Sequence, residues 1–240
     1  MKILAIGDFH GKFPVKLKKE IEKNLDEIDL ILALGDYTGL DEWRPFFHKQ
    51  LTEAKKGKEV MNVRDVMSKK EYNALVKKDF KAGLDVLKEL NKFGKKVYVI
   101  FGNGDWYNAY HNRGHKTFEP KIKPLKNLYE MSHKNRKFNG INFIGVGGYM
   151  DPDIYFNKKE WAEAQNKKSL KLRIKRRSKS KNKFFNQLTK SKGKRIFVLH
   201  YTPVGAFDIV KSVKANPMNG KSVGVGFFTS AIKKYKPKLA

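Results

Sequence analysis

The chain has 240 residues, of which 40% are hydrophobic and 12% aromatic, and it contains no cysteine. Such a composition is typical of a folded protein with a sizeable core, and the lack of cysteine excludes disulfides, zinc–thiolate sites and thiol nucleophiles. The 52 Lys and Arg residues against 24 Asp and Glu residues give a net charge of +28, which favours anionic partners such as nucleic acid, anionic lipid headgroups or phosphorylated metabolites. No apolar run reaches the roughly 20 residues that span a bilayer. The chain also does not start with a signal-peptide pattern, so we expect a cytoplasmic protein.

The opening of the chain predicts a buried strand that delivers two polar side chains. Residues 3–6 form a short apolar run closed by Gly7, which is typical of a parallel strand in an α/β sheet. Asp8 and His10 follow, two residues apart. Because side chains alternate along an extended chain, we expect both to project the same way at the carboxyl end of the strand, where α/β proteins commonly bind metals.

A second strand of the same kind follows one helix later. Apolar residues recur at helical spacing over residues 17–28, which predicts an amphipathic helix. Residues 30–34 are again apolar and are followed by Gly35 and Asp36. A right-handed strand–helix–strand unit places Asp36 beside Asp8 at the same edge of the sheet. The two carboxylates would repel each other unless a cation lay between them.

Residues 40–94 are predicted to form a helical insertion. Ser68 and Glu71 match a capping box, which marks the start of a helix. Apolar residues then recur at helical spacing, and Gly94 marks the end of that helix.

The third and fourth apolar strands also end in residues of the ligand type. Residues 96–101 are followed by Asn103, whose amide oxygen is an acceptable metal ligand, and it would reach the same rim as the first two carboxylates. Asn139 and Gly140 predict a hairpin, and hence an antiparallel pair of strands. Residues 195–199 predict a further buried strand that ends in His200, which we interpret as a metal ligand because it is the fourth such strand end.

Two other segments supply candidate contacts. The loop over residues 106–124 commonly shapes a substrate pocket in such folds, and its candidate substrate-binding residues are His111, Arg113 and His115. Residues 166–183 form a basic arm, flexible or helical, that is suited to touching phosphates. Its candidate nucleic-acid contacts are Arg173, Arg176 and Arg177. Alternatively, the loop is mobile and its histidines and arginine have no role in binding. The basic arm is alternatively an ordinary solvated surface.

Taken together, the motifs resemble the calcineurin-like metallophosphoesterase superfamily over nearly the whole chain. The segment Gly7-Asp8-Phe9-His10 is similar to its D-x-H motif, Gly35-Asp36 to its second motif, Gly102-Asn103-Gly104-Asp105 to its GN-x-D motif, and His200 to its lone metal histidine. The resemblance implies an α/β sandwich of two mixed β-sheets flanked by helices, as a single domain over residues 1–240.

The resemblance also implies two divalent metal ions. Asp8, His10 and Asp36 would hold the first, Asp36 would bridge, and Asn103 and His200 would hold the second. The catalytic residues would then be Asp36 and Asn103. Mixed Asp, Asn and His ligands favour Mn, Fe, Zn or Ni over Mg or Ca.

The implied function is hydrolysis of phosphodiesters or phosphomonoesters, with a metal-activated water attacking phosphorus in line. One alternative is a catalytically incomplete scaffold that binds polyanions or nucleic acid. Another is a nuclease in which the basic arm holds a nucleic-acid strand across the metals. The sequence predicts no oligomeric state.

The chain departs from the family pattern in two places. Gly104 stands where many members carry a histidine that protonates the leaving group, so we expect a good leaving group, or an acid supplied by the substrate, His111 or His115. The last family motif, G-H-x-H, follows a strand soon after a helix. We expect that helix over residues 222–235 and the start of that strand at residues 236–240, so the motif would fall beyond the last residue unless the site is incomplete.

Overall fold

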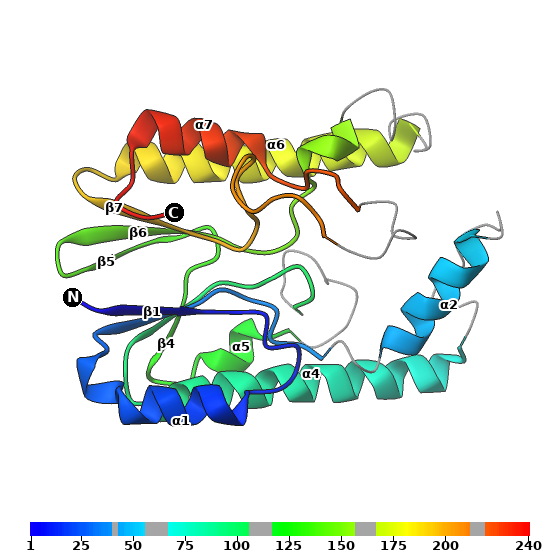
Figure 1. The fold of residues 1–240 in the computed structure, drawn as a ribbon, viewed down its shortest axis with the longest axis horizontal. Helices are drawn as coiled ribbons and strands as arrows, with labels where there is room; N and C mark the ends of the chain where they lie inside the picture. The colour runs from blue at the N-terminus through cyan, green and yellow to red at the C-terminus, as the bar shows by residue number, and fades with distance from the viewer. Residues whose placement is uncertain (40–42, 56–66, 106–116, 157–166, 212–218) are drawn as a thin grey trace. The chain divides into compact units, whose positions relative to one another are not determined.

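The computed structural model describes residues 1–39, 43–55, 67–105, 117–156, 167–211 and 219–240. The chain divides into two compact units, Met1–Glu130 and Met131–Ala240. Each unit has its own β-sheet, its own helices and its own hydrophobic core (Figure 1). The fold is therefore mixed α/β, as the sequence predicts.

The first unit is built on a sheet of four strands, all parallel. In spatial order these strands are β1 (Ile3–Ile6), β2 (Leu30–Ala33), β3 (Val97–Val99) and β4 (Leu128–Glu130). β2 lies between β1 and β3 with all of its residues buried, which explains its continuously apolar sequence. We expected two mixed sheets, but over its described strands this sheet is parallel, because a helix connects each consecutive pair of strands.

Helix α1 (Val15–Lys23) makes the first connection and is shorter than the apolar pattern predicts. Asn24 follows its last residue and caps it, and the Asn24 side-chain amide donates to the carbonyl of Glu20 at 2.8 Å, a bond that competes with continuation of the helix. The chain then passes through a 3₁₀ turn, Leu25–Glu27. Ile28 is still buried in the core of the first unit, but from an extended segment rather than from a helix.

Helix α4 (Lys69–Lys92) connects β2 to β3 and begins with the predicted capping box. Ser68 Oγ accepts the backbone N–H of Glu71 at 3.2 Å, and the Glu71 carboxylate accepts the N–H of Ser68 at 2.7 Å. The apolar residues that α4 contributes to the core are Val76, Val86, Leu87 and Leu90. α1 and α4 cover the same face of the sheet (Figure 1), so this part of the predicted insertion belongs to the core.

Two further helices belong to the first unit. Helix α2 (Arg44–Lys55) precedes α4 in the chain. Helix α5 (Glu119–Ile122) connects β3 to β4 and buries Ile122 in the same core.

The second unit contains a mixed sheet of three strands, β5 (Asn135–Phe138), β6 (Ile141–Val146) and β7 (Arg195–Leu199). β5 and β6 are antiparallel, and β7 is parallel to β6. Asn139 and Gly140 form the predicted tight turn with φ angles of 44° and 74°, as a two-residue hairpin of this type requires.

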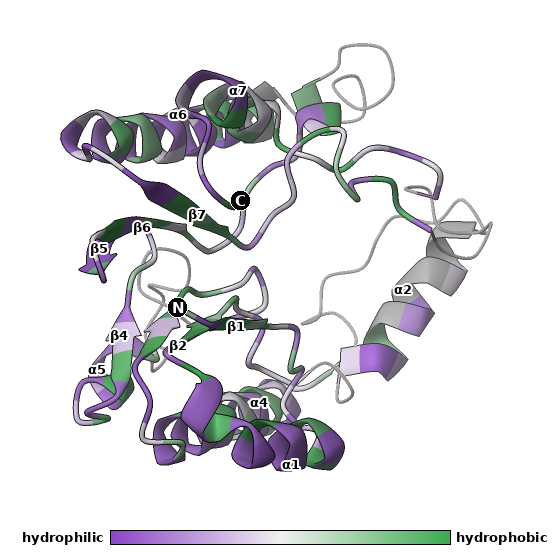
Figure 2. Ribbon diagram, turned by 60° about the vertical axis from the view of Figure 1, so that its left-hand side comes forward, coloured by the Kyte–Doolittle hydropathy of each residue, from purple (hydrophilic) through white to green (hydrophobic). Residues whose placement is uncertain are grey.

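Helix α6 (Lys167–Lys190) and helix α7 (Gly226–Tyr235) cover one face of this second sheet (Figure 1). Phe184 on α6 packs against Phe228 on α7 and Phe197 on β7, with ring centroids 5.4 Å apart in both pairs. The structure therefore selects the helical alternative for the basic arm. Figure 2 shows hydrophilic residues along α6, whereas β7 is largely hydrophobic.

The end of the chain runs beside β7. Leu239 forms a parallel bridge with Ile196, and the backbone N–H of Lys238 donates to the carbonyl of Arg195 at 2.8 Å. Within the described ranges, no helix is both long and apolar enough to cross a membrane.

Candidate metal centre

Three of the predicted ligand residues come together just beyond the ends of β1 and β2. The ligand atoms of Asp8, His10 and Asp36, one from each side chain, lie within 4.8 Å of one another. Backbone hydrogen bonds continue past the strands: the N–H of Asp8 donates to the carbonyl of Gly35 at 3.0 Å, and the N–H of His10 to that of Asp36 at 2.9 Å. These bonds hold the two segments side by side and keep the three side chains together.

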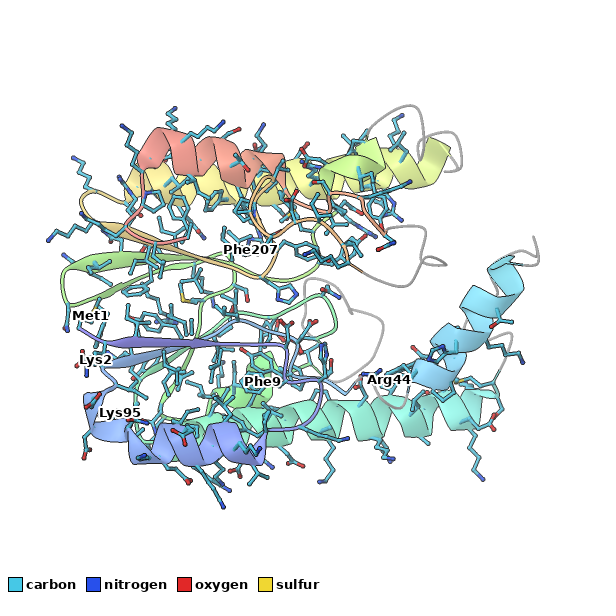
Figure 3. All side chains as sticks on the ribbon, in the orientation of Figure 1. Met1, Lys2, Phe9, Arg44, Lys95 and Phe207 are labelled. Atoms are coloured by element: carbon cyan, nitrogen blue, oxygen red, sulfur yellow. The ribbon has the colours of Figure 1, made fainter. Side chains whose placement is uncertain are left out.

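The backbone of all three residues lies in the left-handed region, with φ angles of 54°, 47° and 54° in chain order. For L-residues this conformation costs about 1–2 kcal/mol each, and such strain is concentrated at functional sites. Asp8 and His10 thus converge for a different reason than the predicted one: β1 ends at Ile6, and left-handed turns rather than strand alternation direct them. Between them lies Phe9, which is labelled in Figure 3. Phe9 is buried and stacks on Tyr37 with ring centroids 5.7 Å apart, which anchors the loop in the core.

The turn after β3 contacts Asp36. The backbone N–H of Gly104 donates to Oδ1 of Asp36 at 3.0 Å, and the Thr38 hydroxyl donates to the carbonyl of Gly104 at 2.8 Å. A Cβ atom on Gly104 would lie in van der Waals contact with Asp36 Oδ1, at 3.4 Å, and slightly too close to Thr38 Oγ1, at 3.3 Å. Asn103 precedes Gly104 in the same turn and is exposed. The backbone of this turn therefore contacts the cluster through Gly104, and the role of Asn103 as a metal ligand stays a prediction.

The segments after β2 and β3 approach each other so closely that Gly35 cannot carry a side chain. A Cβ atom at this position would lie 2.4 Å from the backbone nitrogen of Gly102. Gly35 also has a φ of 103°, which L-residues rarely adopt. The Gly–Asp pattern at this strand end therefore has a steric cause.

Asp105 ties the second and third motifs together from below the surface. Its side chain is fully buried, and its carboxylate accepts four backbone N–H groups, at distances between 2.7 and 3.2 Å. The donors are Asp36, Tyr37, Thr38 and Gly102. Burial raises the pKa of Asp105 to about 7, opposed by the backbone N–H groups and reinforced by the charge of Asp36. From the sequence, Asp105 was predicted only as part of the GN-x-D motif, and its positioning role was missed. The signal that could have indicated this role is its place two residues after the candidate ligand Asn103.

The donor set fits a divalent cation. Two carboxylates and one imidazole are ligands that Mn, Fe, Zn and Ni accept. Asp36 is buried, with 7% of its surface exposed, whereas His10 is half-buried and Asp8 exposed. Three protein ligands at such a partly open position leave coordination places for water or substrate.

The other predicted ligand, His200, follows β7 in the second unit. It is half-buried, its backbone N–H donates to the carbonyl of Val146 at 3.2 Å, and its ring lies edge-on to Tyr201 at 5.4 Å. Its role as a metal ligand stays a prediction. The candidate substrate-binding residues His111, Arg113 and His115 lie outside the described residues.

Two of the three candidate nucleic-acid contacts on α6 are engaged within the second unit. Arg173 forms an ion pair with Asp151, and Arg177 forms one with Asp153. Both guanidinium groups are partly buried. Arg176 is exposed. A role of these three residues in binding nucleic acid stays a prediction, and the ion pairs give Arg173 and Arg177 a structural role of their own.

The fold is similar to those of solved structures at low sequence identity. One crystal structure is 16% identical, with the alignment covering 98% of this chain and 80% of the other and a TM-score of 0.58. The crystal structure of the protein TT1561 of Thermus thermophilus is 14% identical, with 98% and 77% covered and a TM-score of 0.43. Because its sequence identity is so low, the structure with the TM-score of 0.58 shows a similar fold and nothing about function. Among curated proteins, no sequence matches the chain.

The motifs and the fold agree with a family assignment that spans both units. A family model described as calcineurin-like phosphoesterase matches residues 1–227, from before β1 into the first turn of α7. The match contains every motif that the sequence resemblance used, from the Asp8 segment to His200. The chain therefore belongs to the calcineurin-like phosphoesterase family, a superfamily of metal-dependent hydrolases.

Proposed function

We propose that this protein is a metal-dependent phosphoesterase in which Asp8, His10 and Asp36 hold a divalent ion. The observation that carries the proposal is the convergence of their ligand atoms to within 4.8 Å, in a chain of this family. When bound, such an ion supplies Lewis acidity toward a phosphate oxygen and lowers the pKa of a coordinated water.

Hydrogen bonds within the chain orient the candidate ligands before a metal ion binds. The hydrogen bond from Gly104 to Oδ1 fixes the rotation of the Asp36 carboxylate. The backbone bonds between the Asp8 and Asp36 segments hold the main chains that carry the two carboxylates side by side. Ligands that are already oriented lose little freedom when a cation binds, which increases affinity.

The proposal extends to a second divalent ion, with Asp36 bridging and with Asn103 and His200 as candidate ligands. Asp36 and Asn103 are then the proposed catalytic residues. Support comes from the order of the four motifs, all within the region that the family model matches. The metal is proposed to be Mn, Fe, Zn or Ni on the basis of the donor types. We also propose a cytoplasmic location, on the basis of the sequence alone. No oligomeric state is proposed.

The substrate we propose is a phosphate ester with an acidic leaving group, such as an aryl ester. Gly104, next to the cluster, has no side chain with which to protonate a departing oxygen. A leaving group that is stable as an anion needs less help from a general acid. The net charge of +28 would attract anionic substrates, and this attraction should weaken as salt is added.

Hydrolysis of an aryl phosphate monoester and an aryl phosphodiester by the full chain tests the proposal. We expect turnover with Mn²⁺, Zn²⁺, Ni²⁺ or Fe²⁺ and none after chelation. Asp36→Asn should lose more than about 100-fold, since loss of an outer-sphere partner alone costs 10- to 100-fold. Asp26→Asn, which removes the same charge from an exposed position, is the matched control and should keep the activity. Activity that persists after chelation or in Asp36→Asn would contradict the proposal, and no turnover with any metal would favour a non-catalytic scaffold.

A further inference from the structure

Helix α6 carries many positive charges and contains no acidic residue of its own. Its 24 residues include eleven Lys and Arg residues and no Asp or Glu, whereas α4, of equal length, has seven basic and four acidic residues. On α4, Asp85 and Glu89 pair with neighbouring lysines, as Lys81 does with Asp85 at 2.8 Å. Because like charges four residues apart on a helix repel each other, these basic residues destabilise α6 unless anions lie beside it. Asp151 and Asp153, outside the helix, pair with Arg173 and Arg177 and offset two of the eleven charges.

The basic residues of α6 are divided between two faces. Arg173 and Arg177 lie on the inner face, in helical register with the buried Phe184 and Leu188. Lys171, Lys175 and Lys179, which we call the lysine row, are all exposed. They are four residues apart, so they form one outward row with a rise of about 6 Å between neighbours. None of the three makes an ion pair with a residue that the structure describes.

The inner arginines hold α6 in a fixed orientation. Arg177 pairs with Asp153, and Asp153 Oδ1 also accepts the backbone N–H of Gly226 at 3.0 Å, which links α6 to the start of α7. Arg173 pairs with Asp151 in the same segment. The lysine row is therefore presented by an anchored helix rather than by a loose arm.

We infer that the lysine row binds the phosphate backbone of a nucleic-acid duplex, whatever the base sequence of that duplex. An extended row of separated positive charges matches an extended polyanion better than a single phosphate. The two aromatic residues of α6, Phe184 and Phe185, pack in the core of the second unit, so α6 offers no ring for stacking on the bases of a single strand.

The exposed apolar residues of α6 argue against a lipid surface as the partner. Leu172 and Ile174 are both about half exposed. They are two residues apart and so lie on nearly opposite sides of the helix. A helix that lies in a membrane interface needs exposed apolar residues gathered on one face, and the exposed apolar residues of α6 are not gathered in this way.

The test measures binding of the full chain to a fluorescent DNA duplex of about 20 base pairs by anisotropy, with chelator present so that no hydrolysis intervenes. The row variant combines Lys171→Gln, Lys175→Gln and Lys179→Gln. The matched variant combines Lys16→Gln, Lys19→Gln and Lys23→Gln, which removes three exposed charges from α1 in the first unit. We expect the row variant to bind at least about 10-fold more weakly at 0.1 M salt, with a salt slope smaller by about 2–3, and the matched variant to bind within about 2-fold of the wild type.

Several outcomes would overturn the inference. Equal weakening in both variants would show that only the net charge matters. The inference would also be wrong if the wild type did not bind the duplex, or if the row variant bound as tightly as the wild type. Tighter, row-dependent binding to phosphatidylserine vesicles, or to a single strand, would assign the row to that partner instead. Thermal unfolding of the row variant should occur at or above the wild-type temperature, because three mutually repelling charges are removed.

Discussion

The carboxylate of Asp105 accepts the backbone N–H of Asp36 at 2.9 Å, so the last residue of the third motif holds the main chain of the second. Three further backbone N–H groups, from Tyr37, Thr38 and Gly102, donate to the same carboxylate. Because Asp105 is fully buried, no water can replace these bonds. Asp105 therefore positions Asp36 without being a candidate metal ligand itself.

Asp105→Asn should damage both stability and metal binding. One carboxylate oxygen becomes an amide NH₂ that cannot accept, which leaves two backbone N–H groups unpaired. We expect a loss of about 2 kcal/mol or more in the free energy of unfolding and a weaker affinity for divalent metal, measured by urea unfolding and metal titration. Asp85→Asn on the outer side of α4 is the control. An Asp105→Asn protein with wild-type stability and metal affinity would exclude a positioning role.

Gly35→Ala should be far more damaging than Gly94→Ala, although both glycines have positive φ. At Gly35 the new Cβ would meet the backbone nitrogen of Gly102 at 2.4 Å, whereas at Gly94 nothing lies within 4 Å. Gly94→Ala should cost about 1–2 kcal/mol from backbone conformation alone. Gly35→Ala should cost several times more, or prevent folding, in chemical unfolding experiments. Similar costs at both positions would show that the close approach of the two segments is wrong.

Arg177→Met should destabilise the protein, and Arg176→Met should not. Arg177 is 16% exposed and its partner Asp153 is 45% exposed, so the pair is only partly desolvated. We expect a loss of about 1–3 kcal/mol in the free energy of unfolding, less than for a fully buried pair. Arg176 is exposed, and its replacement should change the free energy by less than about 0.5 kcal/mol. The reverse order in urea unfolding would contradict the anchoring of α6 through its inner face.

His133 should make the stability fall as the pH is lowered. Burial lowers the pKa of His133 to about 4, with Lys183 adding to the effect, and within the described residues Nδ1 is buried without a hydrogen-bond partner. The unfolded chain takes up this proton near pH 6.5. The unfolded state therefore binds more protons between about pH 6.5 and 4, and the stability should decrease by about 2–3 kcal/mol as the pH falls through this window.

His133→Asn removes this proton uptake and suits the left-handed backbone, where His133 has a φ of 57°. Unfolding free energies of the wild type and the variant, measured between pH 4 and pH 8, should converge as the pH falls. Parallel pH profiles for the two proteins would show that His133 is not the cause.

The strand ends were predictable from sequence because two physical demands coincide there. A parallel strand buried on both faces must be continuously apolar, as β2 is, and a polar side chain placed directly after it stands out. The turn at Asn139 and the capping box at Ser68 were equally predictable, because each depends on a few adjacent residues.

Features that depend on distant contacts were not predictable from the same patterns. β4 has only three residues and is recognisable as a strand only beside β3. The left-handed backbone of Asp8 and His10 was not predictable, because Asp and His are enriched in that region but adopt other conformations far more often. Arg173 and Arg177 lie at helical spacing from the buried residues of α6, which places them on its inner face. Their structural role was missed because many other basic residues surround them in the sequence.

The most direct test of the account is a calorimetric titration of Mn²⁺ into the full chain and into His10→Gln. His10 contributes one of the three converging ligand atoms, and His133→Gln, in the second unit, is the matched control. We predict at least one ion bound per wild-type chain, an affinity at least about 10-fold weaker in His10→Gln, and unchanged binding in the control. No binding by the wild type, or equal affinity in His10→Gln, would contradict the assignment of this cluster as a metal centre.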